Sequence, residues 1–296
     1  MSTPIILIHK GDSFYLPYTL IQVKTTNPES EIFLIGDSKN SHYKFITHIN
    51  IDKYFDKAQK FSNLYKHMNS NQYFAELYCF QRWFVLYDFM KTNNLKKCIY
   101  IDSDVMLYED ILKEKRFEEF DLSFSGKSPH FSFINNLDAL EDFCSFIISL
   151  YKDNELLEML KKEYKEYSSD GRKGGICDMT AIQKYSDKCK HNGFFKIGNV
   201  QLLKNSLEIY DHSMNSPDGF EVKNSIKNVY LKEKKPFCKQ ISSNTEFKFM
   251  GLHFQGESKK SIRKYYTGNK TMLNYYIFIY KFKKIVGYLH KSCKMS

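Results

Sequence analysis

The sequence predicts an α/β fold, in which helices flank an open sheet. Short apolar runs at residues 4–9 and 32–35 read as strands, and a helix-like stretch at 15–25 lies between them. A longer apolar run at 98–107 follows the helical apolar stripe of residues 73–90. Uninterrupted apolar runs are typical of strands that are covered on both faces, so we expect the run at 98–107 to be central.

Shorter elements are expected after this core. Residues 121–125 read as a strand, and 136–167 as a helical stretch with a charged C-terminal half. The Ser- and Gly-rich residues 168–175 are interpreted as a mobile loop that precedes a helix over 179–188. A smaller β-rich part then follows, with strand-like segments at 200–203, 208–210, 228–231 and 247–253.

Composition narrows the class of protein. The chain has 296 residues, is 42% hydrophobic and carries a net charge of +10, which favours an anionic partner such as nucleic acid, anionic lipid or a phosphate-rich substrate. Its 7 cysteines are scattered singly, which fits a reducing compartment. The sequence shows neither a signal-peptide pattern nor a membrane-spanning run, so we expect a cytoplasmic protein.

The most informative segment is the apolar run that leads into Asp102 and Asp104. In open α/β sheets ligands bind beyond the carboxyl ends of the strands, where this Asp-x-Asp lies. Residues two apart on a strand share a face, so both carboxylates can reach one hard divalent cation. A solvated acidic turn is the alternative interpretation.

A second segment, His253-Phe254-Gln255-Gly256-Glu257-Ser258-Lys259, ends the last strand-like run. Histidine suits borderline metals such as Mn²⁺, glycine lets backbone approach a phosphate, and lysine supplies a positive charge. His253 alone would more often be a core or surface histidine.

Together the two segments resemble those of GT-A glycosyltransferases, above all family 8 and related bacterial capsule and lipooligosaccharide enzymes. In that family an apolar strand ends in Asp-x-Asp, and His-x-x-Gly-x-x-Lys follows, here about 150 residues later. The resemblance implies Asp102, Asp104 and His253 as metal ligands, and Gly256 and Lys259 as contacts of the diphosphate. It also implies a GT-A fold with a Rossmann-like, mixed nucleotide-binding sheet.

Three further residues are implied by the resemblance. Asp12, in the loop after the first strand, would face the nucleotide base, and Arg82 would contact the metal carboxylates or the phosphates. Arg82 could equally be an ordinary surface arginine of a helix. Asp178 matches the acceptor-side acidic residue and is the candidate general base, or it is simply a helix N-cap. Asp211 and His212 are secondary candidates for which we expect a structural role.

These expectations define the parts of the chain. We expect a single GT-A domain over residues 1–270, with a nucleotide-sugar half at about 1–125 and an acceptor half at about 126–270. Residues 271–296 form a basic, aromatic, amphipathic segment. That segment either lies on an anionic membrane surface, on the inner face of the cell membrane, or packs on the domain with its lysines in solvent.

The resulting hypothesis is a hexosyltransferase that uses Mn²⁺ or Mg²⁺ and a nucleotide sugar, a UDP-sugar above all. Its acceptor would be a surface glycan or a lipid-linked glycan. A sugar nucleotidyltransferase is the rival enzyme, although residues 8–13 lack the glycine-rich basic loop such enzymes carry. A non-catalytic basic protein that binds RNA or lipid is the third alternative.

Overall fold

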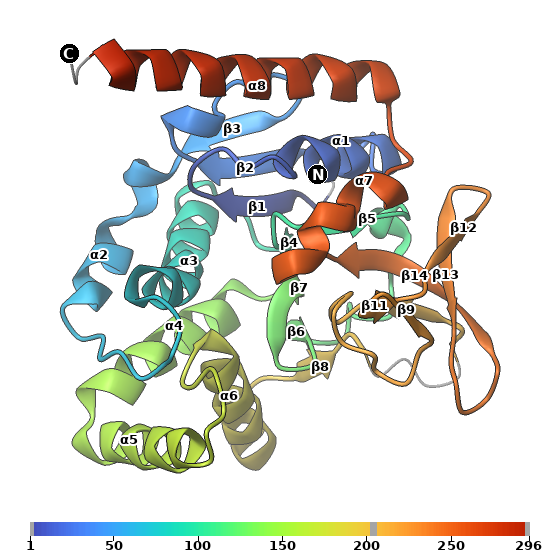
Figure 1. The fold of residues 1–296 in the computed structure, drawn as a ribbon. Helices are drawn as coiled ribbons and strands as arrows, with labels where there is room; N and C mark the ends of the chain where they lie inside the picture. Colours follow the sequence, from blue (N-terminus) through green and yellow to red (C-terminus); the bar gives the residue numbers. More distant parts are fainter. Residues whose placement is uncertain (1–2, 202–205, 294–296) are drawn as a thin grey trace.

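The computed structural model describes residues 3–201 and 206–293, and it confirms the mixed α/β architecture. A seven-stranded sheet has the order β3-β2-β1-β4-β7-β6-β8 (Figure 1). Strands β3, β2, β1 and β4 are mutually parallel, β7 runs antiparallel to both of its neighbours, and β8 is parallel to β6. The strands of this sheet are β1 (Ile5–His9), β2 (Ile32–Gly36), β3 (Thr47–Asn50), β4 (Cys98–Ile101), β6 (Leu122–Ser125), β7 (Ser128–Ile134) and β8 (Ile197–Asn199).

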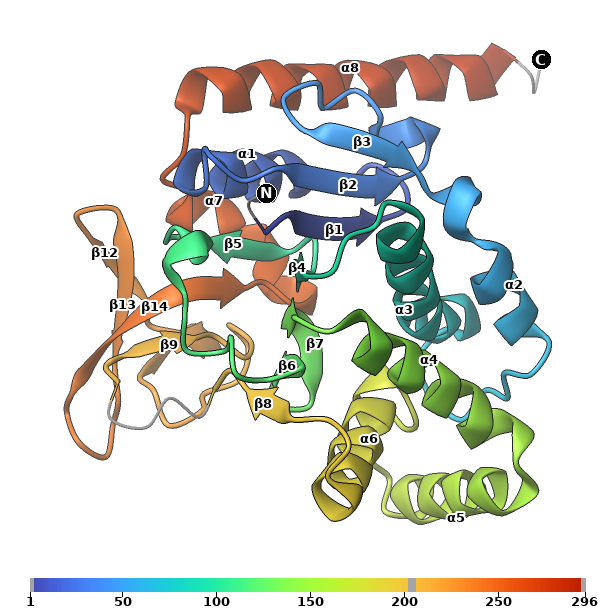
Figure 2. The ribbon, with the colours of Figure 1, turned by 180° about the vertical axis from the view of Figure 1, so that it is seen from behind.

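A second, five-stranded sheet is formed mainly by the C-terminal part of the chain. Its order is β12-β13-β14-β5, and β9 pairs with the other side of β14. These strands are β5 (Val105–Leu107), β9 (Glu208–Tyr210), β12 (Tyr230–Lys232), β13 (Lys235–Lys239) and β14 (Glu246–His253). A short hairpin of β10 (Val222–Lys223) and β11 (Ile226–Lys227) lies beside it (Figures 1 and 2).

Helices cover both faces of the seven-stranded sheet. They are α1 (Leu16–Thr26), α2 (Asp56–Ser62), α3 (Tyr73–Thr92), α4 (Leu137–Lys152), α5 (Asn154–Ser169), α6 (Asp178–Asn192), α7 (Ile262–Tyr265) and α8 (Lys270–Cys293). Short 3₁₀ helices occur as η1 (Ser38–Asn40), η2 (Ile51–Tyr54), η3 (Ile111–Lys113) and η4 (Gly256–Ser261). The apolar runs of the sequence are continuous because the strands bury side chains on both faces.

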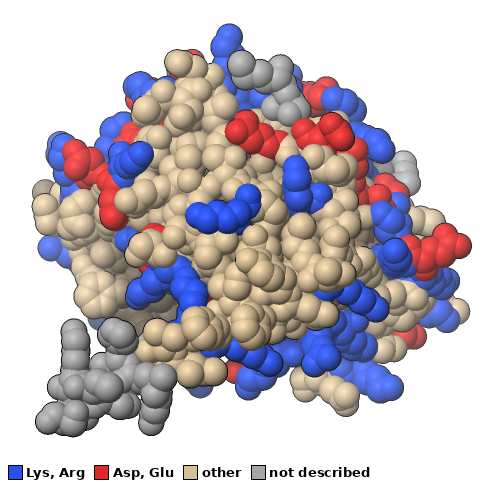
Figure 3. All heavy atoms as spheres, turned by 90° about the horizontal axis from the view of Figure 1, so that it is seen from above, with Lys and Arg blue, Asp and Glu red and all other residues tan. Residues whose placement is uncertain are grey.

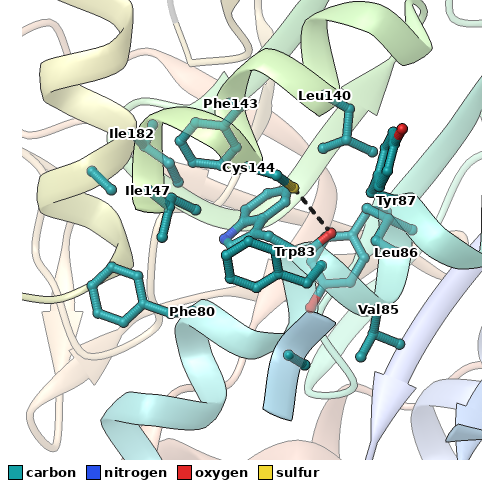
Figure 4. Close-up of a cluster of buried hydrophobic side chains, with 14 of the residues drawn as sticks. Phe80, Trp83, Val85, Leu86, Tyr87, Leu140, Phe143, Cys144, Ile147 and Ile182 are labelled. Atoms are coloured by element: carbon teal, nitrogen blue, oxygen red, sulfur yellow. Dashed lines mark hydrogen bonds between the residues drawn. The ribbon is translucent and has the colours of Figure 1, made fainter. Parts of the chain in front are cut away.

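Alternation along β1 divides the interior into two cores. Ile6 and Ile8 point to the core shared with α2 to α6, whereas Ile5 and Leu7 point to the core shared with α1, β5, β14 and α8. Trp83 of α3 lies in the first core, edge-on to a phenylalanine of α4 and surrounded by apolar side chains of α3, α4 and α6 (Figure 4). This packing fixes the rotation of α3, and with it the direction of the residues on its sheet-facing side.

Two sequence-based expectations need correction. The stretch 136–167 is two helices, because Asp153 breaks it: its carboxylate accepts the backbone N–H groups of Glu155 and Leu156 and caps α5. The loop expected at 168–175 begins only at Asp170, because residues 168 and 169 end α5, and its far end contacts the segment before α3. Its Gly174 carbonyl accepts from the Ser70 N–H at 3.0 Å, and the Gly174 N–H donates to Ser70 Oγ at 2.7 Å. The mobility of this loop stays a prediction.

The strand expected at 200–203 is also displaced. Strand β8 ends at Asn199, Val200 lies in a turn, and residues 202 and 203 lie outside the described residues. Among the helices that the structure describes, none is long and apolar enough to cross a membrane.

Candidate active site

The two carboxylates of the Asp-x-Asp motif lie at the junction of the two sheets. Residues 102–104 form a turn between β4 and β5, closed by the Val105 N–H donating to the Asp102 carbonyl at 3.0 Å. The shared-face argument for a strand was therefore wrong in its geometry. The turn, rather than strand pleating, brings the carboxylates of Asp102 and Asp104 together.

His253 completes the cluster from the end of β14. This strand runs antiparallel to β5, with His253 opposite Val105, so the pairing places the imidazole beside the turn. One ligand atom from each of Asp102, Asp104 and His253 lies within 4.8 Å of the other two. Asp104 and His253 are buried, at 8% and 4% exposure, so the cluster is not a solvated acidic turn.

The tautomer of His253 is fixed by a backbone contact. Its Nδ1 lies 2.7 Å from the His212 carbonyl oxygen, which can only accept, so Nδ1 carries a proton. Nε2 then points to Asp104 Oδ1 at 3.5 Å and is free to act as a ligand when the ring is neutral. A backbone carbonyl on the far nitrogen is the arrangement that metal-binding histidines usually have.

Beneath His253 lies a buried polar layer that the sequence did not reveal. The imidazole stacks on that of His130 at 4.2 Å between ring centroids, and its backbone N–H donates to Asp211 Oδ2 at 3.2 Å. Asp211 Oδ1 in turn accepts from Lys227 Nζ at 2.7 Å, in a pair with side-chain exposures of 0% and 1%. Asp211 thus has the structural role expected for it: it holds the end of β14.

Charge in the cluster is balanced by Lys259 of η4. Its Nζ lies 2.9 Å from Asp104 Oδ2 and 5.0 Å from the ring centroid of Tyr15. Burial disfavours the charged form of Asp104, but His253 and Lys259 outweigh it and hold the pKa of Asp104 below its ordinary value. Burial likewise lowers the pKa of His253, yet the charge of Asp104 raises it above its ordinary value overall.

Gly256 begins η4 with a positive φ of +54°. This conformation turns the chain so that Lys259 comes back toward Asp104, and glycine adopts it without the strain of a side chain. A Cβ at Gly256 would meet only Asn215 Nδ2 at 3.7 Å, so the space before the backbone is open.

Arg82 lies on α3 and joins the cluster to α6. Its guanidinium donates to Asp102 Oδ1 at 2.7 Å and to Asp178 Oδ2 at 2.6 Å, and it also reaches the Tyr100 hydroxyl at 3.3 Å. With a side chain only 13% exposed, Arg82 is not an ordinary surface arginine. It links two carboxylates that lie 76 residues apart in the sequence, 102 and 178.

Asp178 is the first residue of α6, and its side chain is not the N-cap. Cys177 occupies the cap position, while Asp178 Oδ2 accepts from Arg82 and from Trp83 Nε1 at 3.3 Å. Burial raises the pKa of Asp178 above its ordinary value, and the charge of Arg82 partly opposes that rise.

Asp12 does not join the carboxylate cluster among the described residues. It follows β1, and its Oδ1 accepts from the Tyr43 hydroxyl at 3.0 Å, while Oδ2 lies 3.7 Å from His42 Nε2. His9 lies between the two regions, since its Nδ1 is 2.9 Å from the Ser103 hydroxyl of the turn. The role of Asp12 toward a nucleotide base stays a prediction.

The chemistry of the donor set fits a divalent cation. Two carboxylates and one neutral imidazole offer oxygen and nitrogen ligands, which suits Mn²⁺ better than a cation that takes oxygen alone. Lys227, Arg82 and His130 supply the surrounding contacts. Only Arg82 had been singled out, through the resemblance, because a lysine or histidine within a strand gives no signal of what it will contact.

No protein-family model matches the sequence, and none of the curated proteins compared with it matches. Solved structures similar to the chain include mouse xyloside xylosyltransferase 1 in its apo form, at 11% identity and a TM-score of 0.47, over 69% of this chain and 89% of that one. The galactosyltransferase LgtC with donor and acceptor sugar analogues is 11% identical, with a TM-score of 0.39 over 91% of this chain and 98% of its own. The glycosyltransferase GlyE of Streptococcus pneumoniae TIGR4, in its apo form, is 12% identical, with a TM-score of 0.43 over 93% and 63%. The names of all three describe glycosyl transfer.

Proposed function

We propose that the chain is a GT-A glycosyltransferase that moves a hexose from a nucleotide sugar, a UDP-sugar above all, to a surface-glycan or lipid-linked acceptor. One observation supports this most. Two carboxylates and a histidine, from motifs about 150 residues apart, converge within 4.8 Å beside a lysine.

Asp102, Asp104 and His253 are the residues that would hold the cation, Mn²⁺ or Mg²⁺. A cation there would stabilise, as a Lewis acid, the negative charge that collects on the departing diphosphate. The low pKa of Asp104 keeps that carboxylate ionised, which is the form that metals bind. The His212 carbonyl holds the proton of a neutral His253 on Nδ1 and so leaves Nε2 to the metal, which has to displace a proton there because the pKa of His253 is raised.

The chain's own residues supply the remaining charge and order. Lys259 would exchange its contact with Asp104 for a phosphate oxygen, and so stabilise the leaving group as its charge develops. Arg82 fixes the Asp102 carboxylate through a charge-assisted hydrogen bond, which keeps that ligand in one rotamer. The open backbone at Gly256 lets a diphosphate come close to the chain.

The contacts of Asp178 favour a positioning role over that of general base. Its Oδ2 already accepts two hydrogen bonds, and the residue is 3% exposed, so an acceptor hydroxyl would have to reach its other oxygen. We propose that Asp178 orients Arg82, and that deprotonation of an acceptor hydroxyl by Asp178 requires the acceptor to enter beside α6.

The test is release of UDP from a panel of UDP-sugars in the presence of Mn²⁺, Mg²⁺ or EDTA. The proposal expects slow, metal-dependent hydrolysis of one donor, reduced by about 10²–10³ in Asp104→Asn, as when one transition-state contact is lost. Asp187→Asn, a surface carboxylate of α6, is the matched control and should keep wild-type turnover.

Two outcomes would overturn the proposal. Normal turnover in a folded Asp104→Asn variant would remove the metal site. Conversion of the UDP-sugar and added diphosphate into UTP and a sugar 1-phosphate, without release of UDP, would identify a nucleotidyltransferase. Salt-sensitive RNA binding without any metal-dependent nucleotide binding would favour a non-catalytic basic protein.

A further inference from the structure

The C-terminal helix α8 presents an apolar stripe to the outside of the molecule. Tyr275, Phe278, Phe282 and Ile285 are 60%, 67%, 57% and 59% exposed. Their spacing of three or four residues places them along one side of the helix. We refer to these four residues as the outer stripe. Large apolar side chains in a row are unusual on a free surface and indicate a surface that is covered in use.

The opposite side of α8 is fixed to the domain, which determines where the outer stripe points. Leu273 and Tyr276 are 7% and 6% exposed, and the Tyr276 hydroxyl accepts the Lys44 N–H at 3.2 Å. The Tyr276 ring packs at 5.0 Å against Phe45. The helix therefore lies along the edge of the molecule, above α1 and β3, and cannot turn its outer stripe inward (Figures 1 and 2).

The charges on and around α8 are complementary to an anionic surface. Between residues 270 and 286 the sequence has four lysines and no aspartate or glutamate. Lys281 is exposed next to Phe282 of the outer stripe, and Lys284 is exposed on the flank of the helix, where its Nζ lies 5.5 Å from the ring centroid of Tyr280. Lys283 turns toward the domain, and its Nζ lies 3.0 Å from His42 Nδ1. Seen from this side, the molecule shows mainly uncharged and basic residues around the helix, with most acidic ones toward the rim (Figure 3).

We propose that α8 binds an anionic membrane surface, with the outer stripe in the boundary between headgroups and acyl chains and its lysines among the headgroups. Aromatic residues and lysine on a helix that is too polar to span a bilayer are typical of such interfacial helices. The helix has 24 residues, or about 36 Å, so it can lie flat over several lipids. This proposal does not depend on the proposed glycosyl transfer.

A second copy of the chain is the competing occupant. Two copies joined symmetrically through α8 would bring their lysine rows together, and this like-charge contact disfavours a dimer at low salt. An anionic bilayer would instead cover the apolar outer stripe and place anionic headgroups beside the lysines.

The test is sedimentation of the full chain with phosphatidylcholine vesicles, with and without phosphatidylglycerol. We expect binding to the anionic vesicles only, weakened by salt. Phe278→Ser with Phe282→Ser should reduce the affinity at least about tenfold, because two aromatic rings no longer leave water. Lys281→Gln with Lys284→Gln should reduce it by about 30-fold, at about fivefold for each lysine.

The control is Phe194→Ser, since Phe194 is 80% exposed but lies far along the chain, after α6. It should bind vesicles as the wild type does. Equal binding of all variants, or equal binding to neutral and anionic vesicles, would overturn the proposal. A wild-type dimer in sedimentation equilibrium that the serine substitutions dissociate, without vesicle binding, would assign the outer stripe to a second copy instead.

Discussion

Replacing Lys227 with Met removes a positive charge that the fold buries between two carboxylates. Lys227 Nζ lies 2.7 Å from Asp211 Oδ1 and 2.6 Å from both Asp218 Oδ2 and the Ser213 carbonyl. Asp218 is 33% exposed and can recover water, but the Asp211 side chain is 0% exposed and would keep an unpaired charge. Loss of one partner of a buried ion pair costs about 3–5 kcal/mol, a large share of the usual stability of a domain.

The second variant separates charge from packing. In Asp211→Asn combined with Lys227→Met no fully buried charge is left unpaired, and the amide oxygen can still accept the His253 N–H. The double variant should therefore lose only about 1–2 kcal/mol, the scale of one or two neutral hydrogen bonds. Its recovery relative to Lys227→Met alone measures the cost of leaving the Asp211 charge buried without its partner.

Urea unfolding, followed through the fluorescence of the single tryptophan, Trp83, measures these free energies. Lys190→Met, at an exposed position of α6, is the control and should stay within about 0.5 kcal/mol of wild type. The reasoning is refuted if Lys227→Met is as stable as wild type, or if the double variant is no more stable than the single one.

Three further predictions concern the loop before α6, the bridge from α3 and the metal ligands. Gly175→Ala should destabilise the fold by well over the roughly 1 kcal/mol expected for Gly171→Ala. A Cβ at Gly175 would lie 2.4 Å from a backbone oxygen, whereas a Cβ at Gly171 would face open space, and urea unfolding of the two variants measures the difference. Arg82→Met leaves the buried Asp178 without its charge partner and raises the pKa of Asp178 further. The free energy of unfolding should therefore fall as the pH rises from about 4 to 7, and more steeply than in wild type; unfolding experiments at several pH values that show no such fall would contradict this. A proton on His253, whose pKa lies above its ordinary value, competes with the metal for the imidazole. The affinity for Mn²⁺ should therefore rise by up to about tenfold per pH unit between about pH 6 and 8, and calorimetric titrations that show no such rise would remove His253 from the ligand set.

Local patterns in the sequence account for much of the fold. The apolar runs that became β1, β2 and β4 are continuous because their strands are covered on both faces, which is a property of each strand by itself. The two motifs around Asp104 and His253 could be placed near each other only through the resemblance to a known family. Nothing in the spacing of residues alone says that β14 pairs with β5.

The contacts that order the site could not be predicted from the sequence, because they form between distant segments. Arg82 meets Asp178 across 96 positions, and Lys227 meets Asp211 through the hairpin β10-β11, whose short strands carry little apolar pattern. The turn at 102–104 was missed for a different reason. The apolar run continues on both sides of it, so periodicity does not reveal that the chain changes sheets there.

That change of sheets has a mechanical consequence. Asp102 directly follows a strand of the seven-stranded sheet, whereas Asp104 directly precedes, and His253 ends, strands of the five-stranded sheet. The distances between the three side chains therefore depend on the position of one sheet relative to the other. Whatever is held by all three would link the two sheets and resist shear together with the covalent crossing at Ser103.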